Sequence, residues 1–280
     1  MLRIITDTGS DIPYLSAAAL GMESLELAVE FEEFEYDYRN DTDFSVFFEK
    51  LALSKKLPST SQVTPGQYLE VFQEAEAKGD EVLVITISSG ISGTHSSAVM
   101  ALEMSGYEGI TLVDSRQIFI TQRLLAEHAV KLRDEGQSRA AIAKALEELR
   151  ERQVLLVLLD TMKYLRKGGR IPPAMAILGE ALNIKPALIV RDGWIQALGK
   201  VRGHEAGKQV LWKKFEEDGY DKNWPVYFGY SYDQARGEQF MQESIAKYGI
   251  AGECRKFPVG GVIGTHTGTG AIAIGYVKPQ

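Results

Sequence analysis

The feature that most constrains this chain is an alternation of short, almost continuous apolar runs with longer amphipathic segments. The run from Glu81 to Ile87 is apolar at nearly every position, which is typical of a strand covered on both faces. A segment of helical length follows it, and another short apolar run begins at Ile110. Strands that alternate with helices in this way predict βαβ units and a parallel sheet.

The second half of the chain has a different pattern. Arg191-Asp-Gly193 separates the apolar runs 184–190 and 194–198, and Asp-Gly between two such runs is a strong hairpin signal. We therefore predict an α/β protein in which an N-terminal α/β domain with a mainly parallel sheet covers residues 1–152. A C-terminal α+β domain is predicted over residues 153–280, with the boundary in the charged segment Glu147 to Arg152.

Apolar periodicity also places the individual elements. We expect strands at 2–6, 24–34, 81–87, 110–113, 154–159, 184–190, 194–198, 226–230, 253–257 and 271–277. Helices are expected at 44–53, 66–77, 95–104, 118–133, 138–150, 205–217 and 234–247.

Charge and cysteine content narrow the function classes. The chain has 31 Lys and Arg against 38 Asp and Glu, a net charge of −7, whereas nucleic-acid binding needs a cationic surplus. The single cysteine, Cys254, excludes an internal disulfide framework and fits a reducing compartment. No run of about 18 apolar residues is present, and the amino terminus reads as a strand rather than a signal peptide. We therefore expect a cytoplasmic protein with no nucleic acid partner and no transmembrane segment.

The clearest candidate site follows the Glu81–Ile87 strand. Ser88-Ser-Gly-Ile-Ser-Gly-Thr94 leads into a helix, and a glycine-containing turn between strand and helix presents backbone N–H groups to an anion. Ser92 and Thr94 add hydroxyl donors, although both could simply cap the helix. The nucleophile elbow G-x-S-x-G is not matched, because Gly93 stands one place too early. A serine hydrolase that uses Ser92 is therefore only a rival interpretation.

Two further segments carry hydroxyl or cationic groups. Residues 58–65 hold four hydroxyls, including Thr60 and Ser61, which is more than one helix cap requires. Residues 165–171 place three basic side chains, among them Arg170, around paired glycines. We expect this second segment to be a cationic loop that could meet a carboxylate, a phosphate or an acidic partner, or else a solvated loop without a ligand.

Two more segments lie in the second half. Arg202 belongs to Lys200-Val-Arg-Gly203, expected just after the second strand of the hairpin. Residues 260–270 include five of the chain's 27 glycines together with His266, and we expect a loop whose backbone can approach a ligand closely.

The sequence predicts neither a metal site nor a resident cofactor. The histidines and the single cysteine have no ligand spacing: His95, His128, His204, His266 and Cys254. There is no Walker motif, and no G-x-G-x-x-G follows the first strand. We therefore expect no nucleotide site in this chain.

Taken in order, these segments resemble the DegV family of bacterial fatty-acid-binding proteins, and the resemblance covers essentially the whole chain. It differs from the usual family pattern at Val63, His95-Ser96 and Thr269, which leaves ligand chain length and unsaturation open. The motifs that carry it are Asp7–Pro13, Thr60-Ser-Gln62, Ser88–Thr94, Val113-Asp-Ser115, Leu165–Ile171, Ile184-Lys-Pro186, Lys200–Gly203 and Ile263–Gly270.

The resemblance implies a long-chain fatty acid, such as palmitate or oleate, buried between the two domains. Its carboxylate would be held by the hydroxyls of Thr60 and Ser92. The fatty-acid-binding residues implied in this way are Thr60, Ser61, Ser92, Gly93, Thr94 and His266.

The resemblance also implies a carrier rather than an enzyme, with no catalytic residue of its own. In relatives that work with a fatty acid kinase, the residues matching Arg202 and His266 serve acyl-phosphate chemistry, and the carrier presents its fatty acid to that separate ATP-using kinase. Arg170 is a candidate contact for the kinase or for the phosphate. Two rivals remain: a serine hydrolase or thioesterase using Ser92 and His266, and a regulatory module whose lipid is only structural.

Overall fold

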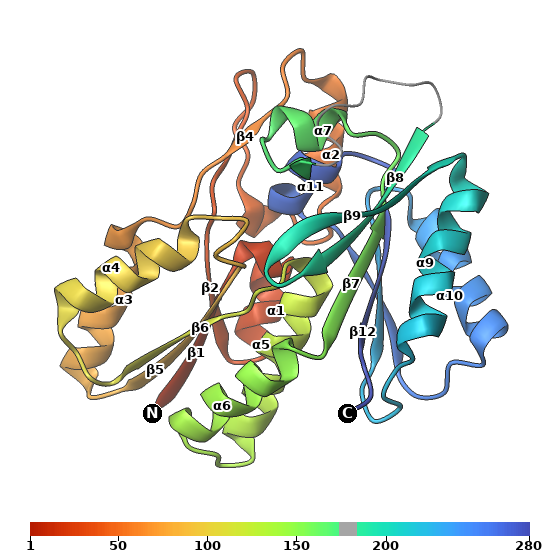
Figure 1. Cartoon of the computed structure of the whole chain (residues 1–280). Helices are drawn as coiled ribbons and strands as arrows, with labels where there is room; N and C mark the ends of the chain where they lie inside the picture. Colours follow the sequence, from red (N-terminus) through yellow and green to blue (C-terminus); the bar gives the residue numbers. More distant parts are fainter. Residues whose placement is uncertain (174–183) are drawn as a thin grey trace.

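Two β-sheets with helices packed around them form the body of the protein (Figure 1). The structure is a computed structural model, and it describes residues 1–173 and 184–280. Within these residues, no helix combines the length and the apolar content that crossing a membrane requires.

The N-terminal sheet is entirely parallel, as predicted. Its strand order is β2-β1-β5-β6, and the interior residues Val82 to Ile85 of β5 are completely buried, because helices cover both faces. In Figure 1, α3 and α4 lie on one face of the sheet, and α5 and α6 lie on the other. The strands are β1 (Leu2–Asp7), β2 (Met22–Leu25), β5 (Glu81–Thr86) and β6 (Ile110–Asp114). The helices of this half are α1 (Tyr14–Ala19), α2 (Ser45–Leu53), α3 (Pro65–Lys78), α4 (Thr94–Ser105), α5 (Phe119–Asp134) and α6 (Arg139–Arg150), with short 3-10 turns η1 (Thr8–Ser10) and η2 (Tyr38–Asn40).

The C-terminal sheet is mixed. Its order is β11-β10-β12-β7-β8-β9, with a parallel β10–β11 pair and antiparallel pairing elsewhere. The predicted hairpin is confirmed, since β8 and β9 pair directly on either side of Asp192-Gly193. Helices α9 (His204–Asp218) and α10 (Gln234–Tyr248) cover the outer face (Figure 1). The strands are β7 (Gln153–Leu158), β8 (Ile184–Arg191), β9 (Trp194–Arg202), β10 (Val226–Tyr230), β11 (Cys254–Pro258) and β12 (Ile272–Val277).

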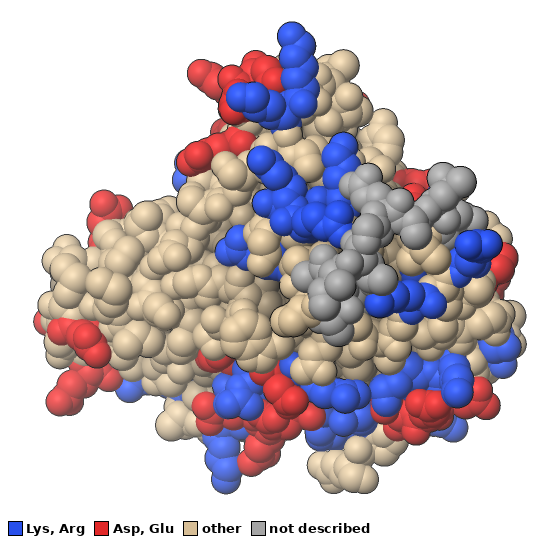
Figure 2. Space-filling view, turned by 45° about the horizontal axis from the view of Figure 1, so that its top comes forward, with Lys and Arg blue, Asp and Glu red and all other residues tan. Residues whose placement is uncertain are grey.

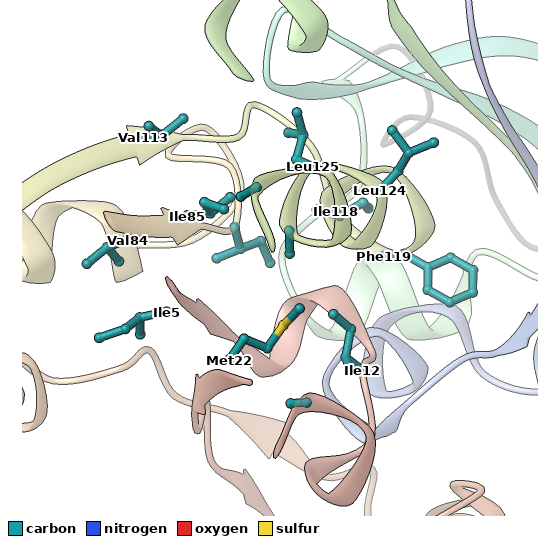
Figure 3. Close-up of a cluster of buried hydrophobic side chains, with 14 of the residues drawn as sticks. Ile5, Ile12, Met22, Val84, Ile85, Val113, Ile118, Phe119, Leu124 and Leu125 are labelled. Atoms are coloured by element: carbon teal, nitrogen blue, oxygen red, sulfur yellow. The ribbon is translucent and has the colours of Figure 1, made fainter. Parts of the chain in front are cut away.

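Helix α5 lies between the two sheets and joins them into one core. Figure 3 shows Leu125 of α5 beside the strand residues Ile85 and Val113, whereas the ring of Phe119 points away from them. That ring packs on β10 at Gly229, where a Cβ atom would lie only 2.2 Å from the ring. One continuous cluster of buried apolar side chains therefore includes residues from both sheets.

Several segments differ from the sequence prediction. The glycine-rich segment expected as a loop contains the helix α11 (Gly261–Thr267), because Gly264 packs on Phe47, where a Cβ atom would lie 2.5 Å from that ring. Residues expected as a connection include β4 (Ser59–Thr60), which pairs antiparallel with β3 (Val29–Glu30). The cationic loop begins as the helix α7 (Lys163–Lys167), and β9 continues through Arg202 instead of ending before it.

Candidate functional site

Segments far apart in the sequence converge on one pocket of about 260 Å³. They are β4 with the two residues after it, the turn between β5 and α4, the residues after α7, and α11. The candidate residues Thr60, Ser61, Ser92, Gly93, Arg170 and His266 thus come together. The complete lining is Leu27, Thr60, Ser61, Gln62, Ile87, Ile91, Ser92, Gly93, Arg170, Val262, Ile263 and His266.

The buried carboxylate of Asp7 holds the turn that carries Ser92. It accepts hydrogen bonds from the backbone N–H of Ile87 (2.7 Å), the backbone N–H of Gly9 (2.9 Å) and the Nε2 of Gln122 (3.0 Å). Burial raises the pKa of Asp7 to about 6, while these three hydrogen bonds act in the opposite direction. The end of β5 is therefore fixed just before the chain turns into the pocket.

Ser92 and Thr94 form a hydroxyl pair at the start of α4. Their side-chain oxygens lie 2.9 Å apart, and the Thr94 backbone N–H donates to the Ser92 hydroxyl at 3.2 Å. The N-cap residue of α4 is Gly93, which has no side chain, so the Ser92 hydroxyl accepts the Thr94 N–H in its place. Capping from the usual N-cap position therefore does not account for the two hydroxyls.

Gln62 links this turn to the strand that carries Thr60. Its Nε2 donates to the hydroxyl of Ser97 on α4 at 2.6 Å. Its Oε1 lies against Gly93, where a Cβ atom would approach to 2.0 Å. Any larger residue at position 93 would therefore force the Gln62 amide to move. Sequence reasoning placed Gln62 in the Thr60-Ser-Gln62 motif but not among the site residues.

Thr60 and His266 face each other in the pocket, with Oγ1 and Nε2 3.0 Å apart. The other ring nitrogen, Nδ1, is buried and has no hydrogen-bond partner among the described residues. Gly168 packs on this edge, because a Cβ atom there would lie 2.1 Å from Nδ1. Burial, with a smaller contribution from the charge of Arg170, lowers the pKa of His266 to about 4. The imidazole is therefore neutral at physiological pH.

The hydroxyls of Thr60 and Ser61 are not needed as helix caps. Thr64 caps α3 in a reciprocal arrangement with Gln67, whose backbone N–H donates to the Thr64 hydroxyl and whose side chain accepts from the Thr64 N–H. Ser61 is instead held by its backbone N–H, which donates to Ala28 at 3.0 Å.

The two candidate arginines lie in different places. Arg170 lines the pocket and donates to the backbone carbonyls of Ile91 (3.2 Å) and Gly168 (2.6 Å). Arg202 is exposed at the end of β9 and is not part of the pocket lining. Figure 2 shows a group of Lys and Arg side chains in the middle of the face that it displays.

The pocket combines one polar end with apolar walls. Hydroxyls, a neutral imidazole and the cation of Arg170 can hold a carboxylate, while Leu27, Ile87 and Val262 offer apolar contact to a tail. Among the described residues, no three or more His, Cys, Asp or Glu are arranged to hold a metal ion.

The geometry does not assemble the hydrolase that the sequence left as a rival. Ser92 pairs with Thr94 and His266 pairs with Thr60, so the described hydrogen bonds do not include one between Ser92 and His266. The free nitrogen of His266 also has no orienting carboxylate within the described part of the chain.

Comparison with known proteins gives concordant results. The family model described as uncharacterised proteins of the DegV family matches residues 1–279. A DegV domain-containing protein of Lactococcus lactis is 34% identical over 97% of this chain and 96% of its own.

Solved structures are similar to this chain over nearly its whole length. A Thermus thermophilus protein, described as a fatty-acid-binding DegV family member, is 30% identical, with a TM-score of 0.86 over 99% of each chain. A stearic-acid-binding protein of Eubacterium ventriosum is 26% identical, with a TM-score of 0.87 over 99% of this chain and 98% of its own.

Proposed function

The chain belongs to the DegV family, and from this premise we propose that it binds a long-chain fatty acid with the carboxylate between Thr60, Ser92 and His266. The observation that carries the proposal is the convergence of these three side chains in a pocket whose walls also include the apolar residues Leu27, Ile87, Ile91, Val262 and Ile263. The fatty-acid-binding descriptions of the Thermus and Eubacterium proteins support it.

The physical chemistry of the pocket suits such a ligand. A carboxylate removed from water must be hydrogen-bonded, and hydroxyls meet this need without burying a second charge. Transfer of about fifteen methylenes from water to an apolar wall contributes on the order of 12 kcal/mol, at about 0.8 kcal/mol each. Ordering of the chain and loss of its freedom offset a large part of this gain.

Analysis of lipid extracted from purified protein tests the proposal directly. Mass spectrometry should detect a long-chain fatty acid, and lipid-stripped protein should bind added palmitate or oleate. The absence of extracted fatty acid together with no binding of either acid would overturn it.

We further propose that the protein presents the bound carboxylate to a separate ATP-using kinase, which forms the acyl phosphate. The exposed basic side chains Lys163, Lys167, Lys200 and Arg202 offer contacts for an acidic partner surface. Arg170 lies at the pocket itself, where it can meet the new phosphate.

Acyl-phosphate formation with the purified kinase and ATP tests this second step. Arg202→Ala should bind fatty acid normally but support slower turnover, since its side chain lies outside the pocket. His266→Ala should lose turnover as well. Unchanged acyl-phosphate formation by both variants would contradict the carrier mechanism, whatever the result of the binding experiment.

A further inference from the structure

A second, much smaller cavity lies beyond the fatty-acid pocket. Its volume is about 10 Å³, close to the minimum that holds one water-sized group. Leu27 and Val262 line both this cavity and the pocket, so these two apolar side chains stand between them. A tail that extends from Ser92 beyond these two side chains would meet the small cavity next.

One wall of the small cavity is the carboxyl group of Asp11. The residue is only 2% exposed, and neither of its side-chain oxygens makes a hydrogen bond of normal geometry with the described residues. Burial raises its pKa well above the ordinary carboxyl range, while the Gly260 N–H and the charge of Arg123 act in the opposite direction. Asp11 is thus a buried polar group with spare hydrogen-bonding capacity that faces a small space.

A second polar wall is the hydroxyl of Tyr36. Its oxygen is buried and makes no hydrogen bond of normal geometry with the described residues, although the Asp41 carboxylate lies near enough to raise its pKa. Asp41 accepts from the backbone N–H groups of Val46 and Phe47, one on each oxygen, and its contact with the Tyr36 hydroxyl lacks the geometry of a normal hydrogen bond. Two polar groups with unused capacity therefore line a cavity whose other walls include Ile12, Val29 and Phe44.

We propose that this cavity, with Asp11 and Tyr36 in its walls, is the far stop of the acyl chain and limits its length by polarity. A methyl end that reaches the cavity displaces water and leaves both groups without a partner, whereas a terminal hydroxyl can replace that water. The inference rests on the proposed fatty-acid binding and adds the class of chain accepted: saturated acids up to a limiting length, and longer ones only with a polar end.

Competition binding with a fluorescent fatty acid tests the proposal. The ligands are the straight saturated acids from lauric to behenic acid and the same acids with a terminal hydroxyl. Affinity should rise with chain length up to a limit and then fall at least tenfold, because each of the two buried groups left unpaired has an effect of about that size. At the first disfavoured length, the terminal hydroxyl should restore affinity by a similar factor.

Tyr36→Phe is the decisive variant and Tyr38→Phe its matched control. The Tyr38 hydroxyl lines the same cavity but already donates to the Ser24 carbonyl at 3.2 Å. Tyr36→Phe should shrink both the length penalty and the gain from the hydroxyl, whereas Tyr38→Phe should leave both unchanged. Thermal unfolding of each variant shows that it is folded.

The outcomes separate this inference from the function on which it rests. Two results would show that the small cavity does not stop the acyl chain: binding of the acids without a limiting chain length, or the same limiting length in Tyr36→Phe as in the wild type. The proposed fatty-acid binding would stand in either case. If no acid binds to any variant, the proposed function is wrong and the inference falls with it.

Discussion

Thr60 and His266 are 206 residues apart in the chain, yet Oγ1 of the threonine lies 3.0 Å from Nε2 of the histidine. Thr60 lies on β4, beside the N-terminal sheet, and His266 lies on α11, just before the last strand of the C-terminal sheet. The polar end of the pocket is therefore complete only when both halves of the chain are packed together.

Removal of the Ser92 hydroxyl should weaken fatty-acid binding. Ser92→Ala takes away one hydroxyl from the carboxylate and also the partner of Thr94, so the expected loss is about 1–3 kcal/mol of binding free energy. Isothermal titration with palmitate measures it. Ser96→Ala, on the exposed side of the same helix, should bind like the wild type. Equal affinity of the two variants would exclude Ser92 from the binding site.

A methyl group at Gly168 should displace His266. Gly168→Ala places a Cβ atom 2.1 Å from Nδ1, so the imidazole must move away from Thr60 and affinity should fall by roughly tenfold or more through the lost hydrogen bond. Gly169→Ala is the control, because it strains a left-handed backbone but meets no atom within 4 Å. If both variants lose affinity equally, loop strain rather than the histidine is the cause.

Titration of His266 should make the fold more stable as the pH rises. Its pKa is about 4 in the folded protein and about 6.5 in an unfolded chain. Its contribution is therefore complete above pH 6.5 and is lost as the pH falls towards 4. Urea unfolding should show the wild type gaining roughly 3 kcal/mol relative to His266→Asn between pH 4 and 7. If the unfolding free energies of the two proteins changed in parallel with pH, His266 would not be buried in its neutral form.

Titration of Asp7 should have the opposite effect and make the fold less stable as the pH rises. Its pKa is about 6 when folded and about 3.9 in an unfolded chain, so the folded protein binds the proton more tightly. This contribution is complete below about pH 4 and is lost as the pH rises through 6. Asp7→Asn has lower baseline stability, because an amide cannot accept both the Gly9 and Ile87 N–H groups as the carboxylate does. Its unfolding free energy should nevertheless rise more steeply with pH than that of the wild type, and an unchanged slope would refute the raised pKa.

Loss of the Ser88 hydroxyl should loosen the contact between the β8–β9 hairpin and the turn that joins β5 to α4. The buried Ser88 hydroxyl donates to the Gly193 carbonyl at 2.6 Å, and Ser88→Ala should cost about 1–3 kcal/mol of stability. The exposed indole of Trp194 is next to this carbonyl, so its fluorescence emission should also change. Ser89→Ala breaks only a contact to Asp114 within the N-terminal half and should leave the emission unchanged.

Local patterns were sufficient to predict most elements of the fold. The parallel sheet follows from buried runs such as 81–87, and the hairpin follows from Asp192-Gly193, because both signals are contained within a few residues. The short strand β4 was missed because its partner, β3, lies about thirty residues earlier and only two residues pair. No local signal marks such a pair.

The site was predictable by residue type but not by arrangement. Helix α11 forms despite the low helix propensity of glycine. A Cβ atom at position 264 would lie 2.5 Å from the Phe47 ring, and one at position 261 would lie 3.0 Å from the Tyr36 hydroxyl. The hydroxyls of Thr60 and Ser92 stood out in the sequence, whereas the packing of Gly168 on His266 depends on contacts that no spacing encodes. The domain boundary at residue 152 stays a prediction.

The position of β12 has a consequence for the order of folding. It lies between β10 and β7 in the middle of its sheet, although it follows all the other described strands in the chain. During vectorial synthesis, β10 with β11 and β7 with β8 and β9 remain two separate pieces until β12 emerges and is inserted between them. The N-terminal sheet has no such dependence and can form while the rest is still being made. Chains from which β12 has not yet emerged would therefore hold an early-folded first half beside an incomplete C-terminal sheet.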